Sequence, residues 1–300
     1  MNTVRSSSPG IFPHNATNVP QPGRLRRRLS APSRSPGAGQ RRQGDRRSVV
    51  PSIAGVAILI LAACGASPPE SASSSTQSST ITVAAAASLT EVFTQIGKDF
   101  EATKPGTTVI FSFGSSATLA SQIAEGAPLD VFAAANPATM QAVTDVGAAD
   151  PPINFVSNTL QIAVPKGNPG RITGLKDFAD KSKKIAICAP QVPCGTAAVK
   201  VFATAKIRPA PDTLEQDVKA TLQKVASDEV DAALVYRTDV IAAREAVEGL
   251  EFSEAQRAVN VYPIAVLKGS ISAAAAQQFV DYVMSADGQA VLRKAGFGKP

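Results

Sequence analysis

Short apolar runs and amphipathic segments alternate along the chain from about residue 81 onward. The run ITVAAAA is typical of a buried strand, and apolar residues then recur at helical spacing from Leu89 to Phe100. The first half contains three such strand–helix pairs: 81–87 with 89–100, 107–113 with 118–125, and 129–135 with 137–147. Strands that alternate with helices predict an α/β fold with mainly parallel sheets flanked by helices.

A second set of elements follows. Strands are expected at 158–168, 183–190, 231–236 and 260–269, and helices at 195–206, at 215–229, from 238, at 273–285 and at 287–297. Segments containing Pro and Gly near 151–170 and 258–268 are the places where the chain would cross between two lobes. We therefore expect lobe 1 to comprise 81–158 plus 262–300, and lobe 2 to comprise 159–261.

The N-terminal segment is expected to be a targeting signal. A basic stretch ends at GDRRS, and the apolar run that follows, VVPSIAGVAILILAAC, is short for a membrane span but suits a signal peptide. Its end, LAAC, resembles the bacterial lipoprotein box, which implies cleavage after residue 63 and acylation of the Cys64 thiol. The Ser-rich stretch 64–80 then reads as a flexible tether. The alternative is an ordinary N-terminal membrane anchor.

The formal charge of +6 comes from this leader segment. Ten of the 30 basic side chains precede Cys64, against one acid, so the remainder has 20 basic and 23 acidic side chains and a formal charge of −3. A basic patch of the kind that binds nucleic acid is therefore not expected.

Histidine and cysteine content narrows the chemistry further. The single histidine, His14, lies before the cleavage point, which excludes a Ser-His-Asp triad, a Cys-His pair and a His-ligated metal from the mature chain. Cys188 and Cys194, in CAPQVPC, favour a small-loop disulfide in an oxidising compartment. Free thiols and a metal pair are the alternatives, although no further metal ligand lies nearby in the sequence.

Three strand-to-helix junctions carry the candidate chemistry. Ser88 stands at an expected N-cap with Glu91 as its capping-box partner, Ser115 and Ser116 precede a helix, and VPCG opens another. Each junction would present unpaired backbone N–H groups and the positive end of a helix dipole, which together suit an oxyanion. The alternative is that each serine only caps its helix.

Several ordered blocks resemble one family. AAAASLTEVF and FSFGSSATLASQIAEGAPLDVFAAAN, followed by VPCGTAA, DVKATLQKV, AALVYRTD and YPIAVLKG, are similar to the periplasmic molybdate-binding proteins of ABC importers over essentially all of 81–300. The resemblance implies a two-lobed periplasmic-binding-protein fold of type II, the venus-flytrap. It also implies a bound oxyanion, molybdate or tungstate, and no other cofactor.

The resemblance also implies a ligand set. The anion would be held by Ser88 and Ser116 from lobe 1, and by the backbone N–H groups of Cys194 and Val218 and the hydroxyl of Tyr236 from lobe 2. Ala117 replaces a third serine that many members carry. For Tyr236, packing in the core is the alternative role.

The expected protein is therefore a binding protein without catalysis, monomeric, lipid-anchored at Cys64 on the extracytoplasmic face and serving an ABC permease of the inner membrane. One alternative is a protein that binds sulfate or another tetrahedral oxyanion. A second is a hydrolase with Ser88 or Ser116 as nucleophile and a Lys base. A third is a lipoprotein that only interacts with other proteins and whose cleft is vestigial. A ferric site lacks clustered Tyr, His or Asp ligands, and a phosphate site lacks an acidic acceptor.

Overall fold

The computed structural model describes residues 78–300, so the predicted signal peptide, Cys64 and most of the tether lie outside the described residues. The first strand begins at Ser79, two residues before the expected start of the folded region. The Ser79 backbone N–H donates to the Gly106 carbonyl at 2.9 Å, which ties this end of the strand to its neighbour. Within 78–300, the helices lack the length and apolar character that a membrane crossing requires.

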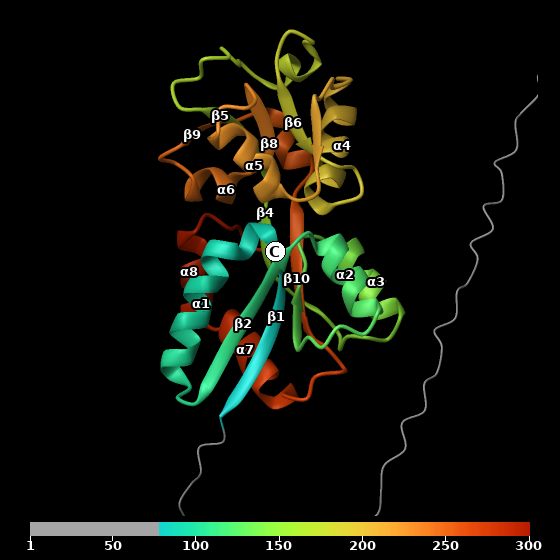
Figure 1. Ribbon diagram of the computed structural model, residues 1–300, viewed down its shortest axis with the longest axis vertical. Helices are drawn as coiled ribbons and strands as arrows, with labels where there is room; N and C mark the ends of the chain where they lie inside the picture. The colour runs from blue at the N-terminus through green and yellow to red at the C-terminus, as the bar shows by residue number, and fades with distance from the viewer. Residues whose placement is uncertain (1–77) are drawn as a thin grey trace, which may run out of the picture. The chain divides into compact units, whose positions relative to one another are not determined.

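The first lobe is built on a five-stranded sheet in the order β2-β1-β3-β10-β4 (Figure 1). Its strands are β1 (Ser79–Ala86), β2 (Thr107–Gly114), β3 (Val131–Ala133), β4 (Ile153–Asn158) and β10 (Asn260–Val266). Its helical segments are η1 (Ala87–Leu89), α1 (Thr90–Thr103), α2 (Ser116–Ala124), α3 (Pro137–Asp145), α7 (Ala273–Met284) and α8 (Ala286–Lys294). β1 pairs in parallel with β2 and β3, whereas β10 runs antiparallel to β3 and β4.

Alternation along β1 builds a core on each face of this sheet. Val83 and Ala85 pack in the cluster that holds Phe93 and Phe279, whereas Ala84 belongs to a separate cluster with residues of α2 and α3. Side chains one residue apart on a strand point to opposite faces, so a continuous apolar run is what a strand covered on both faces requires.

The second lobe has its own sheet, in the order β7-β6-β8-β5-β9. Its strands are β5 (Leu160–Pro165), β6 (Ile185–Cys188), β7 (Thr213–Glu215), β8 (Ala232–Tyr236) and β9 (Val247–Leu250). Its helical segments are η2 (Leu175–Ala179), α4 (Pro193–Ala205), α5 (Val218–Ala226), α6 (Arg237–Ala242) and η3 (Ser253–Arg257). β6 is parallel to β7 and β8, and β5 is antiparallel to β8 and β9.

The predicted two-lobed α/β organisation is confirmed, but the prediction of mainly parallel sheets is wrong, because each sheet has two parallel and two antiparallel strand pairs. The antiparallel part of each sheet is contributed by a strand next to a lobe crossing, β5 in one lobe and β10 in the other. Three strands were not predicted: β4, β7 and β9. β7 has only three residues, β9 contains Gly249, and β4 starts with the exposed Ile153, so none has the pattern of a buried strand.

The chain crosses between the sheets twice, and both crossings lie beside the same pair of asparagines. It leaves the first sheet after Asn158 and enters the second at Leu160; it returns to the first sheet at Asn260. Asn158 and Asn260 face each other in the β4–β10 pairing. β10 thus starts two residues before the expected boundary at 262. In Figure 1, β4 and β10 lie where the two lobes meet.

Candidate functional site

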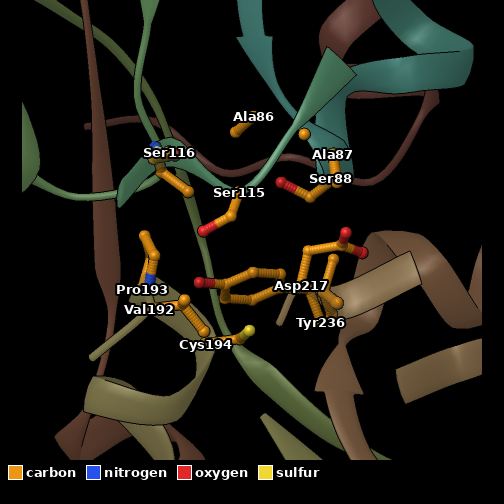
Figure 2. A pocket seen from close by; sticks show the side chains of 13 residues that line it. Ala86, Ala87, Ser88, Ser115, Ser116, Val192, Pro193, Cys194, Asp217 and Tyr236 are labelled. Carbon is orange, nitrogen blue, oxygen red and sulfur yellow. Dashed lines mark hydrogen bonds between the residues drawn. The ribbon is translucent and has the colours of Figure 1, made fainter. Parts of the chain in front are cut away.

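A small cavity lies between the lobes (Figure 2). It has a volume of about 20 Å³ and is lined by Ala86, Ala87, Ser88, Gly114, Ser115, Ser116, Ala135, Val192, Pro193, Cys194, Asp217, Val218 and Tyr236. A site for one water-sized group needs roughly 10–15 Å³, whereas pockets for organic ligands have roughly 300–1,000 Å³. In this form the cavity therefore suits a small inorganic ion better than an organic ligand.

The structure brings all five candidate anion ligands to this cavity. Ser88 and Ser116 come from the first lobe, and Cys194, Val218 and Tyr236 come from the second. Each is at least nine-tenths buried. Ser88 and Tyr236, which are 148 positions apart in the sequence, thus line the same cavity.

Three helices begin at the cavity wall. α2 starts at Ser116, α4 at Pro193 and α5 at Val218. The first-turn N–H groups of a helix have no acceptor within the helix, and they carry the positive end of its dipole. Pro193 has no N–H, so Cys194 supplies the first free donor of α4.

The start of α5 is organised by Asp217. Its carboxylate accepts from the backbone N–H groups of Lys219 and Ala220 at 2.8 and 2.9 Å, which makes it the N-cap of the helix. Figure 2 shows this carboxylate turned away from the serine and tyrosine hydroxyls. The cap therefore leaves the N–H of Val218 available at the cavity wall.

The expected capping box of Ser88 and Glu91 is wrong. Ser88 lies in η1, the N-cap of α1 is Leu89, and no side chain caps that helix. The Ser88 hydroxyl lies 2.9 Å from the Tyr262 hydroxyl, and the Glu91 carboxylate lies 2.8 Å from Lys219 Nζ in the second lobe. Because the short 3-10 turn precedes α1, Ser88 is held at the cavity rather than over the helix end.

The two serines at the start of α2 differ in their partners. Ser116 Oγ accepts from the Ala135 backbone N–H at 3.0 Å. Ser115 occupies the N-cap position without capping the helix, and its buried Oγ has no hydrogen-bond partner among residues 78–300. In Figure 2 the Ser115 hydroxyl points into the cavity toward that of Tyr236. Sequence reasoning noticed Ser115 but did not include it among the ligands, although a serine pair at a helix start was the available signal.

A disulfide joins Cys188, at the end of β6, to Cys194, in the first turn of α4. The loop that it closes passes directly over the start of the helix. A Cβ atom added to Gly195 would lie 1.8 Å from the carbonyl oxygen of Ala189. Only glycine therefore fits at this position, next to the free N–H of Cys194.

The ionisable groups near the cavity keep its hydroxyls neutral. Burial, together with the nearby Tyr262 and Asp239, raises the pKa of Tyr236 well above its ordinary value, so the phenol keeps its proton. Burial also raises the pKa of Asp239 to about 6, although Lys219 Nζ lies 3.0 Å away and opposes the shift. Burial lowers the pKa of Lys219, but the charges of Asp239 and Glu91 more than offset this, so Lys219 stays protonated.

The donor set fits an anion better than a cation. In the part of the chain that the structure describes, no three His, Cys, Asp or Glu side chains are grouped as metal ligands. The cavity presents neutral hydroxyls and helix N-termini instead. Such donors stabilise negative charge without a net opposite charge.

Known proteins share both sequence and fold with this chain. It is 41% identical over 215 residues to the molybdate-binding protein ModA of Mycobacterium tuberculosis, an alignment that covers 71% of this chain and 82% of that protein. The periplasmic molybdate-binding protein of Azotobacter vinelandii superposes with a TM-score of 0.63 at 24% identity, covering 73% of this chain and 99% of that one.

The sulfate-binding protein SubI of Mycobacterium tuberculosis also superposes with a TM-score of 0.63, at 18% identity and over 73% of this chain and 86% of that one. At these identities the two structural matches establish the fold alone. The profile of the bacterial extracellular solute-binding proteins matches residues 81–298, which is most of the chain. The chain belongs to the bacterial extracellular solute-binding protein family.

Proposed function

We propose that the protein binds molybdate, and also tungstate, outside the cytoplasm and delivers it to an ABC importer. The observation that carries the proposal is the 20 Å³ cavity whose wall combines serine and tyrosine hydroxyls with helix N-termini. The relative from Mycobacterium tuberculosis, named as a molybdate-binding protein, supports the choice of ion.

We propose six donors for the ion: the hydroxyls of Ser88, Ser115, Ser116 and Tyr236, and the backbone N–H groups of Cys194 and Val218. Molybdate is a dianion near pH 7 and carries no proton, so it needs donors and no acceptor. A hydrogen bond to a charged group contributes about 1.5–3 kcal/mol, so several converging donors give a tight complex without a cationic side chain.

Cavity size is the basis that we propose for choosing molybdate over sulfate. Both are tetrahedral dianions, but sulfate has shorter bonds. Around the smaller ion some donors would remain unpaired, and each buried unpaired donor costs about 1–3 kcal/mol. Sulfate is the second candidate ligand, because a sulfate-binding protein shares the fold. Tungstate has nearly the size of molybdate, so discrimination between those two is not expected.

The serines act as ligands in this proposal and not as nucleophiles. A hydrolase with a lysine base would need a neutral amine beside Ser88 or Ser116. Lys219 lies close by, but its Nζ is held by Glu91 and Asp239 at 2.8 and 3.0 Å, and its pKa is raised. It therefore stays protonated and is not available as a base.

Closure of the two lobes around the ion would allow a permease to recognise the loaded protein. The proposed donors belong to two lobes and converge only when the cleft is shut, so the ion would favour the closed form, which a permease would recognise. The Lys219–Glu91 ion pair also joins the lobes in this form. We further propose that an acylated Cys64 anchors a monomeric protein to the outer face of the cytoplasmic membrane, where several acyl chains would give a durable anchor.

Thermal unfolding with different oxyanions tests the proposed function. With ligand at a hundred times its dissociation constant, molybdate and tungstate should each add about 2.7 kcal/mol and raise the melting temperature by several degrees. Circular dichroism reports the transition for anion-free protein alone and with molybdate, tungstate, sulfate or phosphate. A shift with sulfate or phosphate instead would overturn the ion assignment, and no shift with any anion would overturn the binding function.

Ser115→Ala should separate affinity from stability. Because the Ser115 hydroxyl is buried and has no hydrogen-bond partner within residues 78–300, its removal should leave the melting temperature of the anion-free protein unchanged or slightly higher. Molybdate affinity, measured by titration calorimetry, should fall by roughly 10- to 100-fold. Ser121→Ala, on the exposed side of α2, is the matched control and should change neither quantity. Unchanged affinity in Ser115→Ala would remove Ser115 from the ligand set.

A further inference from the structure

The two asparagines at the lobe crossings lie directly behind the hydroxyls of the cavity. We propose that Asn260 and Asn158 are positioning residues that orient the hydroxyls of Tyr236 and Ser88 as donors toward the bound anion. The inference rests on the proposed oxyanion function. A hydroxyl can either donate or accept a hydrogen bond, and neighbouring groups decide which of the two each cavity hydroxyl does.

Asn260 acts on Tyr236. Its side-chain nitrogen lies 2.6 Å from the Tyr236 hydroxyl, 2.9 Å from the carbonyl oxygen of Ala135 and 3.4 Å from that of Pro193. Two carbonyl oxygens cannot donate, so the NH₂ group and not the amide oxygen must face this cluster. The Tyr236 oxygen therefore accepts from Asn260, and its single proton remains free.

The free proton of Tyr236 has two possible destinations. One is the neighbouring Tyr262, whose ring centroid lies 6.0 Å from that of Tyr236. The other is the cavity, into which the Tyr236 hydroxyl points in Figure 2. An anion is a stronger acceptor than a neutral phenol, so a bound oxyanion takes this proton.

Asn158 acts on Ser88 through Tyr262. The Asn158 amide is oriented by its oxygen, which accepts from the Thr159 N–H at 3.0 Å, and its nitrogen donates to Thr238 Oγ1 at 2.8 Å. The same nitrogen lies 3.4 Å from the Tyr262 hydroxyl, which in turn lies 2.9 Å from Ser88 Oγ. Either hydroxyl could donate in this contact; in our proposal Tyr262 accepts from Asn158 and donates to Ser88, which leaves the Ser88 proton for the cavity.

Ser116 has the same arrangement, because its oxygen accepts from the Ala135 backbone N–H. Three cavity hydroxyls thus each have an acceptor position already occupied from behind. Because one of the two acceptor positions of each oxygen is filled, the cavity wall favours oxyanions that carry no proton. A hydrogen phosphate would present its own O–H to a wall made of donors and would leave that O–H unpaired.

A double-mutant cycle tests the inference. The full chain, Asn260→Ala, Tyr236→Phe and the double variant are titrated with molybdate by calorimetry. If Asn260 acts through the Tyr236 hydroxyl, Asn260→Ala should weaken binding about tenfold when Tyr236 is present and less than about twofold in the Tyr236→Phe background. It should also narrow the preference for molybdate over phosphate, because the freed Tyr236 hydroxyl can then accept.

A merely structural role gives a different result. Equal losses in both backgrounds, with the preference over phosphate unchanged, would overturn the inference. Ligand-free melting curves establish that each variant folds. If Asn260→Ala does not fold, the cycle of Ser88→Ala with Tyr262→Phe tests the same arrangement on the other half of the site. Failure of the unmutated protein to bind any oxyanion would refute the proposed function, whereas additive losses in a protein that binds molybdate would refute the positioning role alone.

Discussion

Gly195→Ala should destabilise the second lobe by more than about 4 kcal/mol and abolish molybdate binding. The added Cβ would lie 1.8 Å from the Ala189 carbonyl oxygen, 2.5 Å from the Ala189 carbonyl carbon and 2.8 Å from the Cys188 carbonyl oxygen. All three are backbone atoms in the loop closed by the Cys188–Cys194 disulfide, so relief requires the start of α4 to move. That movement would displace the proposed Cys194 donor.

Urea unfolding followed by circular dichroism measures the loss of stability, and calorimetry measures the loss of binding. Gly269→Ala is the matched control, because a Cβ at that exposed position meets no atom within 4 Å. It should change stability by less than about 0.5 kcal/mol. A Gly195→Ala protein with normal stability would show that the loop can shift without cost.

Lys219→Met should cost about 2–3 kcal/mol at pH 8, because it leaves Asp239 buried without a counter-charge, so that this carboxyl must keep its proton two pH units above its pKa in the unmutated protein. Asp239 is fully buried, and Lys219 Nζ lies 3.0 Å from it. The same substitution removes the contact of Lys219 with Glu91 in the other lobe, so molybdate affinity should fall as well.

The stability lost in Lys219→Met should increase as the pH rises. In the unmutated protein burial raises the pKa of Asp239 to about 6, above its ordinary value, so the folded state holds this proton more tightly than the unfolded state. Stability from this group is therefore highest below about pH 4 and falls as the pH rises through about 6. Without Lys219 the pKa rises further. The difference in free energy of unfolding between Lys219→Met and the unmutated protein should thus be small at pH 5 and much larger at pH 8.

Lys224→Met on the same helix supplies the control. Lys224 pairs with Glu229 at 2.6 Å on the surface, where solvent screens the two charges, so its loss should change the stability little at any pH. Denaturant unfolding of both variants between pH 5 and pH 8 is the measurement. A loss in Lys219→Met that is independent of pH would show that Asp239 does not carry the cost.

The sequence was most informative where local pattern decides local structure. The helical spacing of Val92, Phe93 and Ile96 fixes which side of α1 is buried, and Pro137 marks the start of α3. The strand-to-helix junctions located the cavity wall for the same reason, since the start of a helix exposes its N–H groups wherever the helix lies.

Contacts between distant parts of the chain could not be predicted in this way. The pairing of Glu91 with Lys219 joins residues 128 positions apart, and the pattern around Glu91 suggested a local cap instead. The placement of Asn260 behind Tyr236 depends on the pairing of β10 with β4, and β4 was not predicted as a strand. Nothing in the residues next to Ser115 indicated that its hydroxyl would lack a partner.

The pair of tyrosines at the crossings has an optical consequence. The chain has three tyrosines and no tryptophan, and two of them, Tyr236 and Tyr262, lie with ring centroids 6.0 Å apart beside the cavity. Their emission is not masked by indole fluorescence, and the hydrogen bonds of both phenols change when an anion draws the Tyr236 proton. Intrinsic tyrosine fluorescence should therefore follow ion capture in the unlabelled protein, with only Tyr282 as background.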